Sequence, residues 1–176
     1  MRNTVLSLLL LVFAFTVRAA TPAKGSTVKN PSIDMEGYLR VASVAAIHRE
    51  SHRVAEEEFI RLSNEPGTII LDARSESKYD ELHIEGAINL SFPDIAIETL
   101  KQTIPDHNTR ILIYCNNNFR DAEGPFPSKI ARASLNLSTF IALYSYGYRN
   151  VWELAPLIDI KTSKLSFDGT EQVEGR

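Results

Sequence analysis

The sequence predicts an α/β fold in which helices cover both faces of a mostly parallel central sheet, with a helical extension on the N-terminal side. The first observation is a set of short, strongly apolar runs. The second is that helical segments separate these runs, which is typical of sheets whose strands are buried on both faces. The expected strands are 68–71, 87–90, 111–114 and 150–154.

The longest expected helix precedes the first strand, because apolar residues recur over 33–50 with a period near 3.6. Three glutamates open the next helical segment, where negative charge is favourable. Pro93 suits the first turn of a later helix, and Gly147 is a natural stop for the last one. The other expected helices are 55–62, 76–82, 93–103 and 139–146.

Length and composition indicate one globular domain, expected at 33–176. The chain has 176 residues, of which 44% are hydrophobic and 23% charged, ordinary values for a folded domain. The net charge of -3, without a basic block, argues against a nucleic-acid partner. Residues after Pro156 are mostly polar and are expected to wrap the surface.

The N-terminus has the layout of a secretory signal peptide. Arg2 precedes an apolar run at 5–17, and Val17-Arg18-Ala19 offers small or aliphatic residues to a signal peptidase. We expect a signal peptide at 1–19, cleavage after Ala19, and a disordered lead-in at 20–32. The protein would then be periplasmic or secreted, without membrane contact. The alternative is an uncleaved anchor, although the run is shorter than the ~20 residues of a membrane span.

Cys115 is the only cysteine and directly follows the most apolar expected strand. Ligands of open α/β sheets bind at the carboxyl ends of strands. Asn116, Asn117 and Asn118 tolerate left-handed backbone, so a loop of inward-pointing amide groups is expected there. Arg120 would add a forked positive group. Such a loop would stabilise a thiolate or bind an anion, but a buried, inert cysteine is an equally open alternative.

Several short motifs occur in a fixed order along the chain. These are Leu71-Asp72-Ala73-Arg74, then Tyr79, then His83-Ile84-Glu85-Gly86-Ala87-Ile88-Asn89, then Cys115 with four residues before Arg120, then Gly147-Tyr148-Arg149-Asn150-Val151. In this order and spacing, the sequence resembles the rhodanese family over about 54–154. The resemblance implies a three-layer α/β/α fold and a sulfurtransferase activity.

The resemblance also implies roles for individual residues. Cys115 would accept a sulfane sulfur from a small anion such as thiosulfate, form a persulfide, and pass the sulfur to a thiophilic acceptor by double displacement. Neither a metal nor a cofactor is required. The implied substrate-binding loop is Asn116, Asn117, Asn118, Phe119 and Arg120. Asp72, Arg74 and His83 would support the site by holding loops.

Two features depart from the family pattern. Asn118 stands where the family often has glycine, and 121–136 is expected to be an insertion before the next helix. One hypothesis is that the insertion leans over Cys115, with Lys129 or Arg132 adding positive potential. A solvated surface loop is the alternative. A helix that starts late would also leave its N-terminus away from the thiol, so its dipole would contribute little.

Two other functions stay open. Cysteine phosphatases of related fold have five residues between cysteine and arginine, whereas this loop has four, which favours sulfur over phosphate. A persulfide carrier, sensor or binding module with little turnover would keep the fold and change the loop chemistry. The sequence leaves the oligomeric state open.

Overall fold

A computed structural model describes residues 30–171. The chain divides into two compact units, 1–34 and 35–176. In the first unit, residues 30–34 form a short exposed turn. The expected signal peptide and most of the expected lead-in lie outside the described residues. The second unit contains every helix and strand considered below.

The second unit is built on a five-stranded sheet with the order β1-β7-β5-β2-β4, in which every pairing is parallel. The predicted parallel sheet is therefore confirmed. Strand β5 lies in the middle, with Ile113 opposite Leu71 of β2 and Glu153 of β7. The strands are β1 Arg53–Val54, β2 Thr68–Asp72, β4 Ala87–Asn89, β5 Arg110–Tyr114 and β7 Val151–Leu154.

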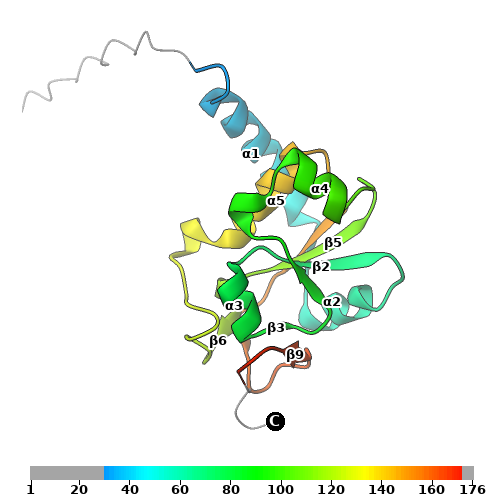
Figure 1. Cartoon of the computed structure of the whole chain (residues 1–176), viewed down its shortest axis with the longest axis vertical. Helices are drawn as coiled ribbons and strands as arrows, with labels where there is room; N and C mark the ends of the chain where they lie inside the picture. The colour runs from blue at the N-terminus through cyan, green and yellow to red at the C-terminus, as the bar shows by residue number, and fades with distance from the viewer. Residues whose placement is uncertain (1–29, 172–176) are drawn as a thin grey trace, which may run out of the picture. The chain divides into compact units, whose positions relative to one another are not determined.

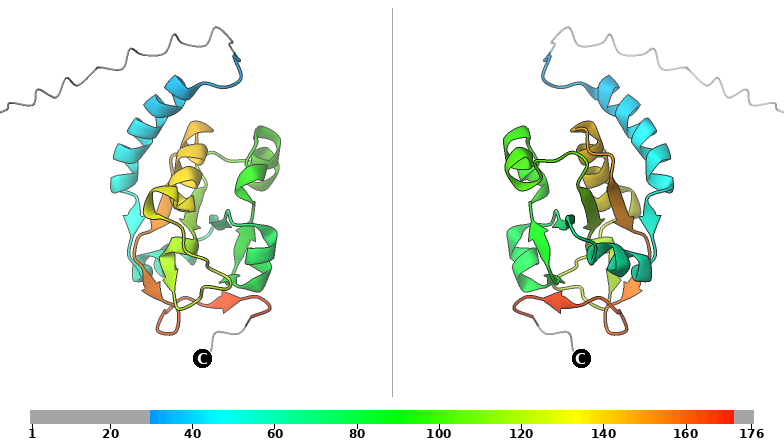
Figure 2. Two further views of the ribbon diagram at one scale, coloured as in Figure 1. Left: turned by 90° about the vertical axis from the view of Figure 1, so that its left-hand side faces the viewer. Right: turned by 90° about the vertical axis from the view of Figure 1, so that its right-hand side faces the viewer.

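Helices cover both faces of this sheet (Figure 1). One face packs against α1 (Met35–Glu50), α4 (Ile97–Thr103) and α5 (Leu135–Ser145), and the other against α2 (Glu56–Ser63). Figure 2 shows α1, in blue to cyan, alongside α5 in yellow to gold. The short helix α3 (Glu76–Glu81) follows β2.

Strand β5 divides the core in two. Ile111 and Ile113 point into the cluster beneath α4 and α5, whereas Leu112 and Tyr114 point into the cluster beneath α2. All four are at most 1% exposed. This burial on both faces explains why the segment is continuously apolar and why its far end is a rigid platform for whatever follows.

The segment predicted as one helix over 93–103 is a 3-10 turn, η1 (Phe92–Asp94), followed by α4. Ile95 separates the two and is buried in the core in an extended conformation. Thr99 accepts the Ala96 N–H and so marks the true start of the helix. Burial of Ile95 therefore overrides the proline signal at position 93.

Helix α5 begins at Leu135, four positions earlier than the start predicted at 139. Its first turn contains Asn136, which is 3% exposed and hydrogen-bonded to Asn118. Because a buried polar residue lies in the first turn, the apolar period of this helix cannot be recognised there from the sequence. The insertion that precedes the helix is therefore shorter than expected.

The C-terminal segment is not confined to the surface, contrary to the prediction. Ile158, Ile160 and Leu165 are buried in the core cluster that also contains Phe59. Four short strands that the sequence did not predict pair there or nearby. Strand β3 (His83–Ile84) pairs with β9 (Phe167–Asp168), antiparallel, and β6 (Phe119–Arg120) pairs with β8 (Ile158–Asp159), parallel. Pairs of two residues are too short to show a period.

Within the described range, no helix has both the length and the apolar character needed to cross a membrane. The same residues contain no group of three or more His, Cys, Asp or Glu side chains placed to hold a metal ion.

Candidate active site

Cys115 lies immediately after the central strand β5, at the carboxyl ends of the parallel strands. This is the edge of an open α/β sheet where ligands bind. The residue is 0% exposed and its thiol is free. The site is therefore a buried sulfur on a rigid platform, reached only through the segments that cover it.

The three asparagines after Cys115 form a single 3-10 turn, η2 (Asn116–Asn118), and we call residues 115–118 the cysteine turn. None of them has a positive φ; among the described non-glycine residues only Asp121 does, at 59°. The expectation that left-handed asparagines shape this loop is therefore wrong. Asparagine is used here for its amide side chain and not for its backbone freedom.

The Asn118 side chain organises the turn. Its Oδ1 accepts the Cys115 N–H at 2.9 Å and an Nδ2–H of Asn136 at 3.0 Å. Its Nδ2 donates to the carbonyls of Leu154, at 2.7 Å, and Pro156, at 3.2 Å. One buried amide thus joins the cysteine turn to α5 and to the end of β7.

Two groups contact the sulfur. The Asn117 N–H donates to Cys115 Sγ at 3.4 Å, and Ser134 Oγ lies 3.4 Å from the same atom. Ser134 is the residue from which α5 starts. The N-terminus of α5 therefore does lie at the thiol, although sequence reading expected a late helix to miss it. Ser134 was not predicted, because nineteen positions separate it from Cys115 and no local pattern marks it.

The insertion is tied to the site instead of lying free in solvent. Asn117 Nδ2 donates to the Lys129 carbonyl at 2.6 Å, and the Lys129 N–H donates back to Asn117 Oδ1 at 3.3 Å. Phe126 is 1% exposed and packs in the core. Lys78 Nζ donates to the Gly124 carbonyl at 2.9 Å. We call residues 121–134 the strap, since they cross the molecule between β6 and α5.

The other two predicted loop residues point elsewhere. The Phe119 side chain is buried against Phe126 and Tyr114 in the core. Arg120 lies in β6, its side chain is 61% exposed, and its guanidinium forms an ion pair with Asp159 of β8 at 3.5 Å. This ion pair joins Arg120 to the C-terminal segment and not to a group of the cysteine turn.

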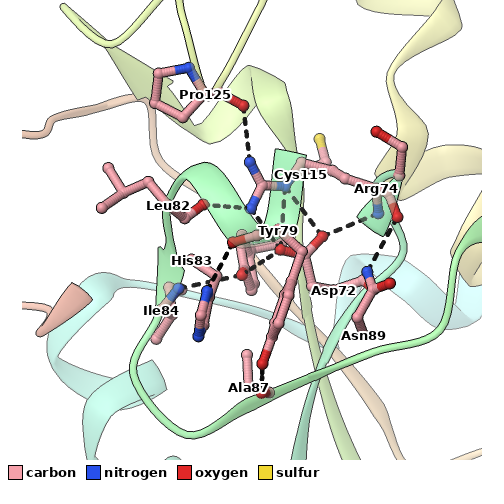
Figure 3. A network of polar contacts seen from close by, with 12 residues as sticks. Asp72, Arg74, Tyr79, Leu82, His83, Ile84, Ala87, Asn89, Cys115 and Pro125 are labelled. Atoms are coloured by element: carbon pink, nitrogen blue, oxygen red, sulfur yellow. Dashed lines mark hydrogen bonds and ion pairs between the residues drawn. The ribbon is translucent and has the colours of Figure 1, made fainter. Parts of the chain in front are cut away.

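Asp72 and Arg74 form a fully buried ion pair beside the site (Figure 3). The guanidinium also donates to the carbonyls of Leu82, at 2.7 Å, and Pro125, at 2.8 Å. Tyr114 donates its hydroxyl to Asp72 Oδ2. Burial first, and then the Asp72 charge, raise the pKa of Tyr114 well above 10. The pair therefore holds β2, β5, the segment after α3 and the strap together.

The remaining signature residues serve local structure. His83 stacks on Tyr79 with ring centroids 3.7 Å apart, and its Nδ1 is 2.7 Å from the Tyr79 carbonyl oxygen. Gly86 has a φ of 80°, which suits the turn between β3 and β4 and would strain a larger residue. Asn89 Nδ2 bridges the carbonyls of Asp72 and Arg74 at 3.0 Å each. Figure 3 shows these side chains in one network.

Two cavities flank the cysteine turn. The larger, of about 430 Å³, is lined by Asn116, Leu135 and Lys129 together with Arg74 and Lys78. Arg74 and Lys78 form ion pairs with Asp72 and Glu81, whereas Lys129 forms no ion pair with any residue that the structure describes. The smaller, of about 270 Å³, lies on the β7 side of the turn and is lined by the apolar residues Ala131, Leu137 and Ala155 and by six polar residues. These are Arg49, Asn117, Asn118, Ser134, Asn136 and Glu153.

A free, buried thiol thus lies at the end of the central strand of a three-layer α/β fold, with two polar groups in contact with its sulfur. The model of the family described as the rhodanese-like domain matches residues 55–155. This chain therefore belongs to the rhodanese-like domain family. No curated protein matches the sequence.

Several solved structures are similar to this chain. The rhodanese-like domain of an Anabaena sp. protein is 21% identical, with a TM-score of 0.48 over 67% of this chain and 79% of its own. A rhodanese with anions from E. coli is 22% identical, with a TM-score of 0.39 over 58% of this chain and 98% of its own. A thiosulfate sulfurtransferase from Pseudomonas aeruginosa is 20% identical, with a TM-score of 0.48 over 74% of this chain and 23% of its own.

Proposed function

We propose that this protein is a sulfurtransferase that carries a sulfane sulfur on Cys115. The observation that supports this most directly is the pair of polar groups 3.4 Å from the sulfur, the Asn117 N–H, which donates to it, and the Ser134 hydroxyl, which is able to donate to it. Donors aimed at a sulfur favour its thiolate, the form that acts as a nucleophile. Membership of the rhodanese-like family supports the same chemistry.

The proposed donor is a small sulfur-bearing anion, with thiosulfate as the test compound. It would approach through the larger cavity, where Lys129 supplies a cation that no described acidic side chain neutralises. The proposed acceptor is a small thiophile. Arg120 remains a proposed donor-binding residue, although its pairing with Asp159 favours Lys129 for that role.

A persulfide carrier or sensor with little turnover is the second candidate. The observation that favours it is the complete burial of Cys115 beneath the strap. Slow exchange of sulfur with small molecules is the expected behaviour of such a protein. A phosphatase is less favoured, because four residues separate Cys115 from Arg120 where phosphatases have five.

The deciding experiment is intact mass spectrometry of the purified protein after incubation with thiosulfate, with Cys115→Ser as the control. We expect the wild type alone to gain the mass of one sulfur atom and to lose it to cyanide, with thiocyanate formed. Rapid turnover supports the enzyme, and a stable adduct that cyanide removes slowly supports the carrier. No added sulfur on folded, reduced protein would reject thiosulfate as the donor.

We also propose that the protein is exported. The support is the arrangement of Arg2, the apolar run and Ala19 in the sequence. Expression in a bacterial host followed by mass determination on the periplasmic fraction tests it. A mature chain starting at Ala20 is the expected result, and an intact N-terminus in the membrane fraction would instead support an anchor.

A further inference from the structure

Ser134 occupies the position from which a serine usually caps its own helix. Its side chain makes no such cap on α5. Only its backbone carbonyl serves the helix start, by accepting the Leu137 N–H at 3.1 Å. The hydroxyl instead lies 3.4 Å from Cys115 Sγ. A group that ordinarily stabilises a helix end is directed at the thiol.

The start of α5, from which this hydroxyl projects, is held in place by the neighbouring residue Asn136. Asn136, two residues further along α5, donates to Asn118 Oδ1 at 3.0 Å, and that oxygen also accepts the Cys115 N–H. Asn136 and Asn118 are 3% and 4% exposed. Moving Ser134 away from the sulfur would break a buried hydrogen bond, which is costly because its partners would be left unpaired.

The chemistry of the contact depends on the charge of the sulfur. A thiol can donate to the serine oxygen or accept from it, but a thiolate can only accept. On ionisation the Ser134 hydroxyl therefore turns its hydrogen toward the sulfur, and the bond becomes charge-assisted and stronger. The Asn117 N–H is a second donor to the same atom.

We infer that Ser134 is a catalytic residue whose hydroxyl, with the Asn117 N–H, stabilises negative charge on the Cys115 sulfur. This inference rests on the proposed sulfur transfer. In the first half-reaction the thiolate attacks the outer sulfur of thiosulfate, a bond forms to Sγ, and the old S–S bond breaks with its electron pair leaving on sulfite. The enzyme then holds a deprotonated persulfide.

In the second half-reaction an acceptor thiol takes the outer sulfur. A new S–S bond joins that sulfur to the acceptor, the bond to Sγ breaks, and its electron pair returns to Cys115 as thiolate. The acceptor's proton ends on the transferred sulfur. Before the first half-reaction Sγ must be ionised, so loss of the Ser134 hydroxyl is expected to slow loading at neutral pH by lowering the fraction of Cys115 present as thiolate. In the second half-reaction charge develops on Sγ as it leaves, so the same loss is expected to slow unloading.

Alkylation with iodoacetamide tests the contact without any sulfur donor. The rate is followed against pH for the wild type, Ser134→Ala, Ser134→Thr and the control Ser128→Ala, which alters an exposed serine of the strap. The alkylation rate at its high-pH plateau reports how accessible the sulfur is. The pH at which the rate is half of that plateau, the midpoint, reports how strongly the thiolate is stabilised. We expect Ser134→Ala to move the midpoint to higher pH and to slow alkylation at neutral pH about tenfold, with rescue by Ser134→Thr.

Single-turnover measurements then follow sulfur loading from thiosulfate and unloading to a thiol. We expect Ser134→Ala to lower the maximal rate of both steps without changing the thiosulfate concentration needed for half-saturation. An unchanged alkylation midpoint in folded Ser134→Ala, or an equal shift in Ser128→Ala, would overturn the inference. If the wild type takes up no sulfur, the proposed function fails, but the alkylation midpoints still decide whether Ser134 stabilises the thiolate.

Discussion

Asn118 stands where the family pattern often has glycine, but its role in this structure differs from that of a glycine. A glycine is needed where φ is positive, and the turn at Asn118 has no such residue. The amide instead makes four hydrogen bonds that close the turn on Cys115, α5 and the end of β7. The site geometry is thus set by one side chain where a flexible backbone would otherwise be required.

Restoring the family glycine is therefore expected to damage this protein. Asn118→Gly removes buried hydrogen bonds and adds backbone entropy to the unfolded chain, at a cost of about 2–4 kcal/mol in the free energy of unfolding. Urea denaturation followed by circular dichroism measures it. A stability equal to that of the wild type would show that the backbone, and not the amide, holds the turn.

The contributions of Lys129 and Arg120 to binding of the sulfur donor can be distinguished by replacing each residue with alanine. Lys129→Ala is expected to raise the thiosulfate concentration for half-saturation about five- to tenfold, because it removes a cation from the larger cavity. Arg120→Ala is expected to have a smaller effect, since its guanidinium already pairs with Asp159. Steady-state kinetics at low ionic strength make the comparison. A larger effect of Arg120→Ala would return the donor-binding role to the predicted residue.

At the scale of elements, the strap is the segment that closes the site. Over the cysteine turn it is held by the two hydrogen bonds between Asn117 and the Lys129 backbone and, at its last residue, by the contact of Ser134 Oγ with Cys115 Sγ. Its other anchors are the buried Phe126 and the carbonyl of Pro125, which accepts from Arg74. The strap is thus pinned firmly on the Arg74 side and more weakly over the thiol.

Cutting the weaker attachment should expose the sulfur while leaving the fold intact. Asn117→Ala is expected to speed iodoacetamide modification of Cys115 several-fold and to cost only about 0.5–1.5 kcal/mol in the free energy of unfolding. Asn64→Ala is a matched control, because it also loses a side-chain bond to a backbone carbonyl, but at the end of α2. Equal reactivity of the two variants would mean that the strap does not limit access.

The sequence predicted the central elements well and the covering elements poorly, for a physical reason. Strands such as 111–114 are apolar because both their faces are buried, so composition alone reveals them. The position of Cys115 followed from the apolar strand before it, and the supporting role of Asp72 and Arg74 followed from the family resemblance, whereas the burial of this pair was not predicted. Ser134 and Asn136 reach the site through tertiary contacts across nineteen and eighteen positions, and no local pattern carries that information.

At the scale of the whole molecule, Tyr114 links the stability of the fold to alkaline pH. Its hydroxyl donates to Asp72 and accepts the Ile84 N–H at 3.1 Å. Burial and the Asp72 charge raise its pKa well above 10, so the folded state holds the phenol proton more tightly than the unfolded chain. The stabilisation is fully present below about pH 10 and is lost as the pH rises above that value.

The variant Tyr114→Phe should reveal how much the Tyr114 hydroxyl contributes to the free energy of unfolding. At neutral pH the variant is expected to be about 1–3 kcal/mol less stable, because Asp72 and Ile84 each lose a buried partner. The difference should narrow as the pH rises above 10, since only the wild type has this phenol to ionise. Urea titrations from neutral pH to above pH 10 measure the difference in the free energy of unfolding and its change with pH. Tyr38→Phe on α1 is the control at an exposed position. A difference that does not change with pH would contradict the linkage.

The complete burial of Cys115 has a consequence for the time course of any reaction at this sulfur. A reagent can meet the thiol only while the covering segments are displaced, so at high reagent concentration the observed rate should level off at the frequency of opening. Turnover would then be limited by a motion of the protein and not by the bond-making step. The same gating would protect a solitary thiol in an oxidising compartment, because oxidants would find it accessible only for a small fraction of the time.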